Sequence, residues 1–345
     1  MTPEERRLHA LDPKEEPNAA RAAHDALESA LFEIKRVIVG QEAMLERVLV
    51  ALLAGGHVLL EGVPGLAKTL TVKTVADVLG GSFKRLQFTP DLVPADLVGT
   101  RIYRPDAGTF DTELGPIFCN FLLADEINRA PAKVQSALLE VMQERQVTIG
   151  TTTFPVPDPF LVMATQNPIE SEGTYPLPEA QIDRFMLKIL IDYPEHDEEL
   201  TIVQRQLTAP PELREALSID ELRELQRAVY DVYVDPSLVS YAVTVATGTR
   251  RPSGIGLPEL DEYIEFGASP RGPIAITQAS RALALVRGRD YVTAEDVKAL
   301  AKDALRHRLV LSYQALAEGV SADEILDKVL AAVAVPEVSL SRPSA

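Results

Sequence analysis

Gly62-Val63-Pro64-Gly65-Leu66-Ala67-Lys68-Thr69 decides the fold, because this loop joins a short apolar run, residues 57–60, to a helical pattern that ends at Gly80 and Gly81. Phosphates bind at such loops, since successive backbone N–H groups and the helix N-terminus face the anion. Lys68 would reach the terminal phosphates, and the Thr69 hydroxyl would ligate magnesium. The stretch therefore predicts a nucleotide-binding loop; the alternative is an ordinary turn from strand to helix.

This loop departs from the general phosphate-loop pattern at one position. Ala67 stands where G-x-x-x-x-G-K-[ST] has a glycine. The alanine adds a Cβ where the backbone should approach the phosphates, and Gly65 supplies flexibility nearby instead. The bare pattern therefore needs support from the rest of the chain.

Four further short runs have the character of strands, and helical or looped segments separate them. They are residues 85–88, 121–124, 160–164 and 186–191. Strands that alternate with helices predict an α/β fold, with a mostly parallel five-stranded sheet covered by helices on both faces. One covering helix begins at Pro131 and places Val134, Leu138, Val141 and Met142 on one face.

Two of these strands end in polar side chains at the carboxyl edge of the sheet, where ligands bind in open α/β folds. Asp125 would hold magnesium, usually through water, and Glu126 would orient and deprotonate an attacking water. Asn167 would sense the γ-phosphate or position the water. The alternatives are favourable acids at a helix N-terminus for the acidic pair, and a simple turn signal for Asn167 with Pro168.

The pattern along the chain predicts two domains and two loose ends. Residues 20–193 form the α/β nucleotide-binding domain, from which two hairpins, residues 100–114 and 147–156, project. Residues 194–335 form an all-helical domain, while 1–19 and 336–345 are a flexible tail and a loose C-terminus. The helical domain carries recognisable helix starts: Ser218 with Glu221, Asp235 with Pro236, Ser269 with Pro270, Thr293 with Asp296, and Ser321 with Glu324.

The charge balance, 34 basic against 51 acidic residues, gives a net −17 over 345 residues. Long-range repulsion from phosphate backbones and anionic membranes makes nucleic acid an unfavoured partner. No apolar stretch reaches the length of a bilayer-spanning helix, and the N-terminus lacks the apolar region of a secretory signal. With Cys119 as its one cysteine, the chain is expected in the reducing cytoplasm, without membrane insertion.

Three other kinds of residue are not expected to form sites. The five histidines have no spacing with a cysteine or carboxylate that would build a metal cage. Cys119 is expected to be a buried, inert thiol. Lys302, Arg306 and Arg308 are interrupted by Asp303 and apolar residues, so we interpret them as the solvated face of an amphipathic helix rather than as a phosphate-binding patch.

Taken in order, these residues resemble an AAA+ ATPase of the MoxR family. The similarity runs from about Ile34 to the end of the helical domain and includes residues 39–41, 62–69, 122–131, 164–168, 177–185 and 267–272. The resemblance implies an AAA+ P-loop core with a C-terminal helical lid, ATP and Mg²⁺ as ligands, and a ring, usually a hexamer, with ATP between neighbouring subunits. Ala67 matches the family's own version of the loop.

The resemblance also implies residue roles. Val39, Gly40 and Gln41 resemble the segment that lines the adenine pocket, and the nucleotide-binding segment extends from Gly62 to Leu70. Arg184 resembles the arginine that completes the neighbour's site; the alternative is a pair with Asp183 or another nearby acid. Arg129 is a further candidate for that role. Arg271 resembles the second sensor on the lid, and the sequence leaves open whether it serves its own site or the neighbour's.

Chaperone-like remodelling or maturation of a protein client is the work that the resemblance implies. Members of the family commonly act with proteins that carry a von Willebrand A domain, so such a protein is one candidate client. Two alternatives stay open at this point. One is an ATP-driven nucleic-acid motor of the same fold, which a DNA-stimulated, salt-dependent ATPase rate would support. The other is a nucleotide-gated scaffold with little turnover.

Overall fold

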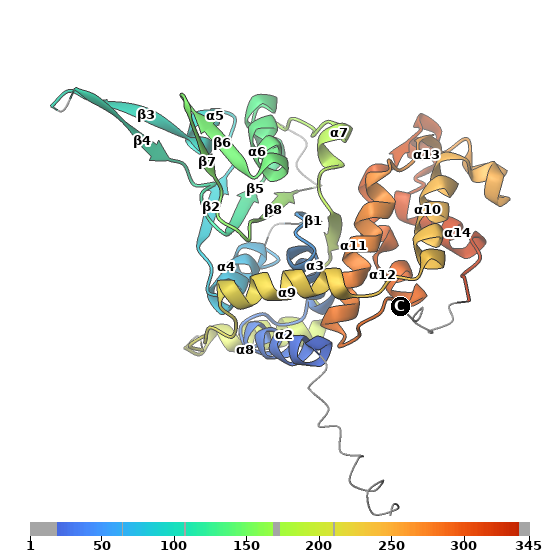
Figure 1. Ribbon diagram of the computed structural model, residues 1–345. Coiled ribbons are helices and arrows are strands. Elements are labelled where there is room, and N and C mark those ends of the chain that lie inside the picture. Colours follow the sequence, from blue (N-terminus) through green and yellow to red (C-terminus); the bar gives the residue numbers. More distant parts are fainter. Residues whose placement is uncertain (1–18, 64, 107, 168–172, 210, 338–345) are drawn as a thin grey trace, which may run out of the picture.

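An α/β part and a bundle of helices lie side by side in this computed structural model, which describes residues 19–63, 65–106, 108–167, 173–209 and 211–337 (Figure 1). The two chain ends predicted to be loose fall almost wholly outside these ranges. Five strands form the central sheet in the order β2-β5-β8-β1-β9. They are β1 (Val58–Gly62), β2 (Phe83–Gln87), β5 (Phe121–Asp125), β8 (Leu161–Gln166) and β9 (Leu187–Ile191).

All neighbouring strands of this sheet are parallel, so their carboxyl ends meet at one edge. Strand β8 lies between β1 and β5, and pairs Leu60 with Thr165 on one side and Leu122 with Val162 on the other. Strand β2 pairs Gln87 with Asp125 of β5. The ends of β1, β8, β5 and β2 therefore form a continuous row.

Alternate residues of the strands enter two hydrophobic cores, one on each face of the sheet. Val58 and Leu60 pack with α2, α3 and α4, whereas Leu59 and Leu122 pack with α5 and α6. Strands buried on both faces need apolar residues at every position, which explains their near-continuous apolar runs. The helices of this part are α2 (Ala19–Lys35), α3 (Glu42–Leu53), α4 (Lys68–Val78), α5 (Pro94–Val98), α6 (Ala132–Glu144) and α7 (Glu179–Ile182), with the 3₁₀ turn η1 (Ile127–Arg129).

Two antiparallel hairpins extend from the α/β part. One is formed by β3 (Gly99–Arg104) and β4 (Thr109–Leu114), and it projects far from the body of the molecule (Figure 1). The other is formed by β6 (Gln146–Ile149) and β7 (Thr152–Pro155) and lies beside α6.

Helices make up most of the remaining chain. Helices α8 (His196–Gln206) and α9 (Ile219–Asp231) run beneath the α/β part close to α2, and Gln226 of α9 donates to Leu52 O of α3 at 2.7 Å (Figure 1). The bundle beside it comprises α10 (Pro236–Arg250), α11 (Arg271–Val286), α12 (Ala294–Leu305), α13 (Tyr313–Glu318) and α14 (Ala322–Ala332), with the turns η2 (Pro252–Ile255), η3 (Pro258–Leu260) and η4 (Arg306–Arg308) and the short strands β10 (Ile264–Phe266) and β11 (Val310–Leu311).

Most helix starts in this region lie where the capping residues predict them. Ser218, Thr293 and Ser321 each form a capping box with the acid three residues later, and Asp235 caps α10. Helix α11 is the exception, because it begins at Arg271 with Pro270 as its N-cap residue, one position later than the start predicted at Ser269. The parallel five-stranded sheet and the helical C-terminal region confirm the predicted fold class.

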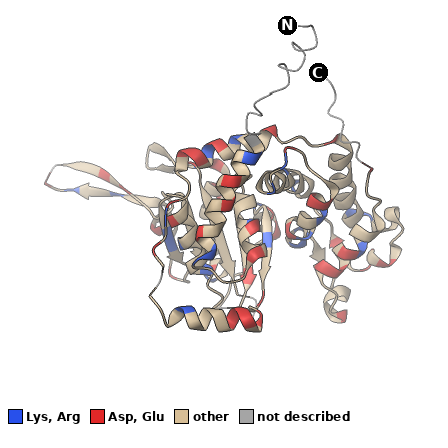
Figure 2. Cartoon of the chain, turned by 90° about the horizontal axis from the view of Figure 1, so that it is seen from below, with Lys and Arg blue, Asp and Glu red and all other residues tan. Residues whose placement is uncertain are grey.

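Acidic residues lie over both parts of the molecule rather than in one tail (Figure 2). The exposed surface is therefore broadly negative, as the net charge of −17 requires. Within the described ranges, every helix is too short or too polar to cross a lipid bilayer.

A buried, neutral histidine ties the amino end of β1 to its surroundings. The His57 ring has Nε2 3.2 Å from Met142 O of α6, and Nδ1 accepts the backbone N–H of Val162 at 3.0 Å. Burial, aided by the positive charge of Arg145, lowers the pKa of His57 to about 3. Burial also lowers the pKa of His307 well below its usual range.

We expect the free energy of unfolding to decrease as the pH falls below about 6.5, the ordinary pKa of histidine. In this range the unfolded chain binds a proton at His57, whereas the folded chain does not until about pH 3. Each such histidine contributes a slope of about 1.4 kcal/mol per pH unit. His57→Gln removes the contribution of one of these two histidines. The free energy of unfolding, measured with urea between pH 7 and 5, should then fall less steeply with pH, by about 1.4 kcal/mol per pH unit. Equal slopes in the two proteins would contradict this account.

Candidate active site

The phosphate loop connects β1 to α4 through backbone conformations that only small residues adopt easily. Gly62 lies against β9, where a Cβ would come 2.6 Å from Ile191 O. Gly65 has φ +91°, and Ala67 is left-handed at φ 53° and ψ 19°. A left-handed alanine costs about 1–2 kcal/mol relative to a right-handed one. Ala67 therefore replaces the glycine of the general pattern but keeps the left-handed backbone conformation that glycine adopts easily. Pro64 lies outside the described residues.

The second half of the predicted phosphate loop, the acidic pair and Asn167 line one cavity of about 430 Å³ at the carboxyl edge of the sheet, whereas Gly62 and Val63 do not line it. It is lined by Gly65, Leu66, Ala67, Lys68, Thr69, Leu70, Arg85, Asp125, Glu126, Thr165, Gln166 and Asn167. Lys68 Nζ donates to Gly62 O at 2.5 Å, so the ammonium closes the loop on itself. Burial lowers the pKa of Lys68, while Asp125, Glu126 and Glu61 oppose that shift.

The acidic pair at the end of β5 is held by neighbouring strands. Asp125 Oδ1 accepts from the Thr165 hydroxyl at 2.6 Å, and Oδ2 accepts from Arg85 at 2.6 Å. Glu126 has a left-handed backbone, φ 55° and ψ 51°, and its N–H donates to Thr165 Oγ1 at 2.8 Å. Thr165 on β8 thus fixes both acids at once. A non-glycine residue in this conformation is uncommon and clusters at functional sites.

The Glu126 carboxylate also has partners of its own. Oε2 accepts from Gln87 Nε2 at 2.8 Å and lies 3.0 Å from Arg129 Nε. Arg129, which the sequence offered as an interface candidate, therefore pairs with an acid of its own chain. Gln87 lies at the end of β2, the strand next to β5.

A second cavity, of about 220 Å³, adjoins the phosphate loop and is bounded by α8. It shares Gly65, Leu66, Ala67 and Leu70 with the first and adds Val37, Ile38, Val39, Gln41, Pro194, Ile202, Arg205 and Gln206. Gln41 is left-handed and donates from Nε2 to Asp192 O at 3.1 Å. Gly40, at φ +65°, lies so near Glu198 that a Cβ would come 2.5 Å from its carboxylate. The cavity is largely apolar, as an adenine ring requires.

Arg184 and Arg271 line neither of these cavities. They line a third, of about 230 Å³, together with Gly55, Gly56 and His57, which precede β1 at the opposite edge of the sheet. Among the residues that the structure describes, the Arg184 side chain has no ion pair, because Asp183 pairs instead with Arg308 at 2.7 Å. Both arginines thus lie away from the phosphate loop of their own chain.

Comparison with known proteins settles the family. Residues 57–187 match the family described as "ATPase family associated with various cellular activities (AAA)", and residues 260–329 match the AAA lid domain. Chaperone MoxR1 of Mycobacterium tuberculosis is 56% identical over 331 residues, which cover 96% of this chain and 88% of the relative. The chain belongs to the MoxR family of AAA+ ATPases.

Two further similarities agree with this MoxR membership. Protein MoxR of Methylorubrum extorquens is 31% identical over 302 residues, covering 81% of this chain and 86% of that protein. The crystal structure of a candidate ATPase from Cytophaga hutchinsonii has a TM-score of 0.87 and 46% identity, covering 92% of this chain and 97% of that one. The fold and the resemblance that the sequence predicted are both confirmed.

Sequence reasoning missed three residues that hold the acids of this MoxR-family cavity: Arg85, Gln87 and Thr165. Arg85 and Gln87 alternate on β2 and so lie on the same face of that strand, which is the signal that was available. Their role depends on β2 lying beside β5, and strand order cannot be read from strand patterns alone. Thr165 comes two residues before Asn167 on a strand that was predicted.

The interpretation of Arg306 and Arg308 as a solvated helix face is wrong. The Arg308 side chain is 3% exposed and that of Arg306 is 9% exposed. Both lie in η4, after α12 has ended, and point inward: Arg306 donates to Lys188 O of β9, and Arg308 donates to Phe185 O, just before that strand. Only Lys302 fits the prediction, with a side chain that is 35% exposed and pairs with Asp327.

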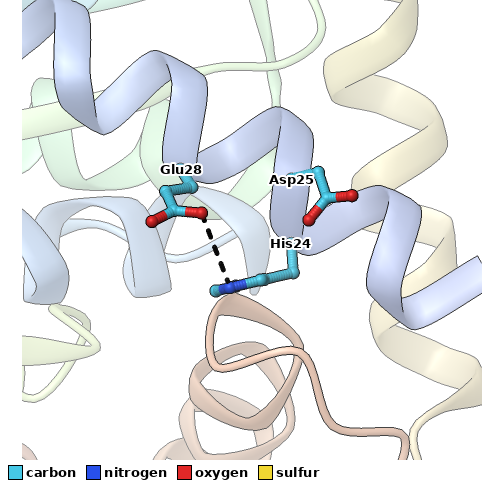
Figure 3. A group of neighbouring side chains, drawn as sticks. All are labelled: His24, Asp25 and Glu28. Carbon is cyan, nitrogen blue, oxygen red and sulfur yellow. Dashed lines mark ion pairs between the residues drawn. The ribbon is translucent and has the colours of Figure 1, made fainter.

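One histidine does lie beside two acids, which the spacing did not suggest. His24, Asp25 and Glu28 on α2 bring one ligand atom each within 4.8 Å of one another (Figure 3). His24 Nδ1 is 2.6 Å from Val286 O, the last residue of α11, so the ring joins α2 to the bundle. We therefore assign His24 a structural role.

Cys119 is buried, and burial raises the pKa of its thiol to about 12, which agrees with an inert thiol.

Proposed function

We propose that this chain binds Mg·ATP at the carboxyl edge of its sheet and hydrolyses it. The observation that carries the proposal is the 430 Å³ cavity, in which the ends of β1, β5 and β8 bring Lys68, Glu126 and Asn167 together. The triphosphate would lie along the phosphate loop, with the base in the adjoining apolar cavity beside Val39 and Ile202.

The donor set fits magnesium. The Thr69 hydroxyl and the Asp125 carboxylate line the same cavity, and Mg²⁺ takes oxygen ligands in proteins. A bound Mg²⁺ would neutralise charge on the phosphate oxygens. Asp125 would hold it through water, since both carboxylate oxygens already accept hydrogen bonds from Thr165 and Arg85.

Glu126 would act as the general base toward water. Its contacts with Gln87 and Arg129 are both made by Oε2, so Oε1 would take the proton from a water at the γ-phosphate. Asn167 would orient the same water or contact the γ-phosphate from the end of β8.

Arg184 and Arg271 would serve a neighbouring subunit. A guanidinium stabilises charge that develops on a transferred phosphoryl group, but both arginines lie in a cavity apart from their own phosphate loop. We therefore propose a ring, a hexamer as the resemblance implies, in which the third cavity of one subunit faces the first cavity of the next.

The output of this cycle would be chaperone-like remodelling of a protein client in the cytoplasm. The relative named Chaperone MoxR1 supports this, and a protein with a von Willebrand A domain stays a candidate client. The hairpin formed by β3 and β4, which projects from the body of the molecule (Figure 1), is a candidate contact for the client. It exposes the rings of Tyr103 and Phe110, whose centroids lie 5.1 Å apart.

A nucleotide-gated scaffold with little turnover is the second candidate. It is favoured by the hydrogen bond from Gln87 and the ion pair with Arg129, which give Glu126 Oε2 partners within its own chain. If the chain is such a scaffold, Glu126→Gln should leave the rate of ATP turnover unchanged, whereas a hydrolase should lose turnover. The variant therefore separates the two functions. The net charge of −17 still disfavours a nucleic-acid motor.

Lys68→Ala should weaken ATP binding by about 10²-fold, because a charged hydrogen bond is worth about 1.5–3 kcal/mol. Lys73 lies on the same helix, exposed to solvent and not lining the cavity, so Lys73→Ala is the matched control and should bind ATP normally. Titration with a fluorescent ATP analogue measures both affinities. Wild-type affinity in Lys68→Ala would mean that the loop does not bind the phosphates.

A further inference from the structure

Arg308 is buried between the bundle and the α/β part, and each of its five N–H donors has an acceptor. Nε donates to Asp183 Oδ1 at 2.7 Å, and Nη2 donates to the backbone oxygens of Asp183 and Phe185 at 3.0 and 2.8 Å. Nη1 donates to Met186 O at 3.3 Å and to Ala304 O. Nη1 also lies 2.9 Å from His307 Nε2. Four of these six contacts go to residues 183–186, the segment that contains Arg184.

The backbone around Arg184 is therefore fixed from both sides by a residue of the bundle. Phe185 is fully buried next to it, while the Arg184 side chain has no ion pair within the described part of the chain. Arg306 adds a bond from Nη1 to Lys188 O at 2.5 Å, further along β9. The backbone of residues 183–186 is therefore fixed, while the Arg184 guanidinium is available to another molecule.

The same contacts connect Arg184 to Arg271. Asp183 accepts from the Ser269 hydroxyl at 2.9 Å and lies 4.0 Å from Arg271 Nε. The Ser269 hydroxyl also accepts the backbone N–H of Arg271 at 3.1 Å. One carboxylate thus joins the start of α11 to the Arg184 segment, with Arg308 as its closest cationic partner.

We infer that Arg308 is a positioning residue, which fixes Arg184 and so sets the geometry of the site that Arg184 completes in a neighbouring subunit. The inference rests on the proposed function, because it assumes that Arg184 acts in trans. Burial lowers the pKa of Arg308 to about 10, so the guanidinium stays charged at neutral pH and keeps its bond to Asp183. Any movement of the bundle at η4 would move the Arg184 segment with it.

The test mixes two inactive chains. Arg184→Ala keeps an intact nucleotide cavity but offers no arginine, whereas Lys68→Ala offers the arginine but binds ATP about 10²-fold more weakly, so the assay uses an ATP concentration at which its own site stays empty. Activity in the mixture arises only where the second chain completes the site of the first. Arg308→Gln is then added either to the Lys68→Ala chain or to the Arg184→Ala chain.

We expect a strongly asymmetric result. With Arg308→Gln in the Lys68→Ala chain, the rate of the mixture should fall about 10²-fold, because misplacing a catalytic group by about 1 Å costs that much. In the Arg184→Ala chain the same substitution should leave the rate within about two-fold. Equal losses in both arrangements would indicate a purely structural role, and no loss in either would also overturn the inference.

Two controls keep the result interpretable. Arg289→Gln breaks another ion pair of the bundle, with the buried Asp296 at 2.7 Å, and neither residue has a hydrogen bond or ion pair with residues 183–186, so the substitution should act equally in both chains. Arg308→Lys keeps a charge beside Asp183 but has three donors in place of five, so the mixture should have an intermediate rate. This variant replaces Arg308→Gln in the test if Arg308→Gln does not fold. If the starting mixture itself is inactive, the trans role of Arg184 is wrong, and the inference falls with it.

Discussion

Glu126→Gln should bind ATP with the affinity of the wild-type protein and hydrolyse it about 10²- to 10⁴-fold more slowly, the usual contribution of a general base. The amide is nearly isosteric with the carboxylate, so the shape of the cavity persists, but it loses the charge that pairs with Arg129 and cannot accept a proton from water. The hydrogen bond from Gln87 can be made to the amide oxygen as well. Steady-state phosphate release and analogue titration measure the two quantities separately.

Glu140→Gln is the matched control for this prediction. Glu140 lies on α6, is exposed and lines none of the three cavities. Its removal should leave the rate unchanged. Unchanged turnover in Glu126→Gln would instead favour the nucleotide-gated scaffold, and loss of ATP binding would show that Glu126 is needed for the structure of the cavity.

Arg184→Ala should bind ATP yet hydrolyse it about 10³- to 10⁵-fold more slowly, because a trans arginine contributes that much in related phosphoryl transfers. Mixing it with Lys68→Ala should restore part of the activity, since each chain supplies the half that the other lacks. Arg214 is exposed and lines none of the three cavities, so Arg214→Ala serves as the control. Full activity of Arg184→Ala alone would contradict the trans role.

The residues of the phosphate loop and of the acid-ended strand could be predicted because each motif is local. The lysine and threonine after a glycine loop, and two acids after a buried strand, carry their chemistry within a few positions. Their meeting in one cavity follows from parallel strands, whose carboxyl ends share an edge.

The remaining parts of the site depend on tertiary neighbours. Arg85 and Gln87 contact the acids only because β2 lies beside β5, and Ile202 bounds the apolar cavity only because α8 folds back under the α/β part. The interpretation of Arg308 was wrong for the same reason: a helical pattern was extended past the end of α12 into η4, where the side chain turns inward to residues 183–186. The position of the boundary near Tyr193 stays a prediction, because α9 contacts both parts of the molecule.

A structure of the assembled protein with Mg²⁺ and a slowly hydrolysed ATP analogue tests the central claim most directly. The account predicts the triphosphate beside Lys68 and Thr69, the base beside Val39, and Arg184 of the adjacent subunit at the γ-phosphate. A nucleotide bound elsewhere, or a phosphate cavity with no arginine from another subunit, would contradict it.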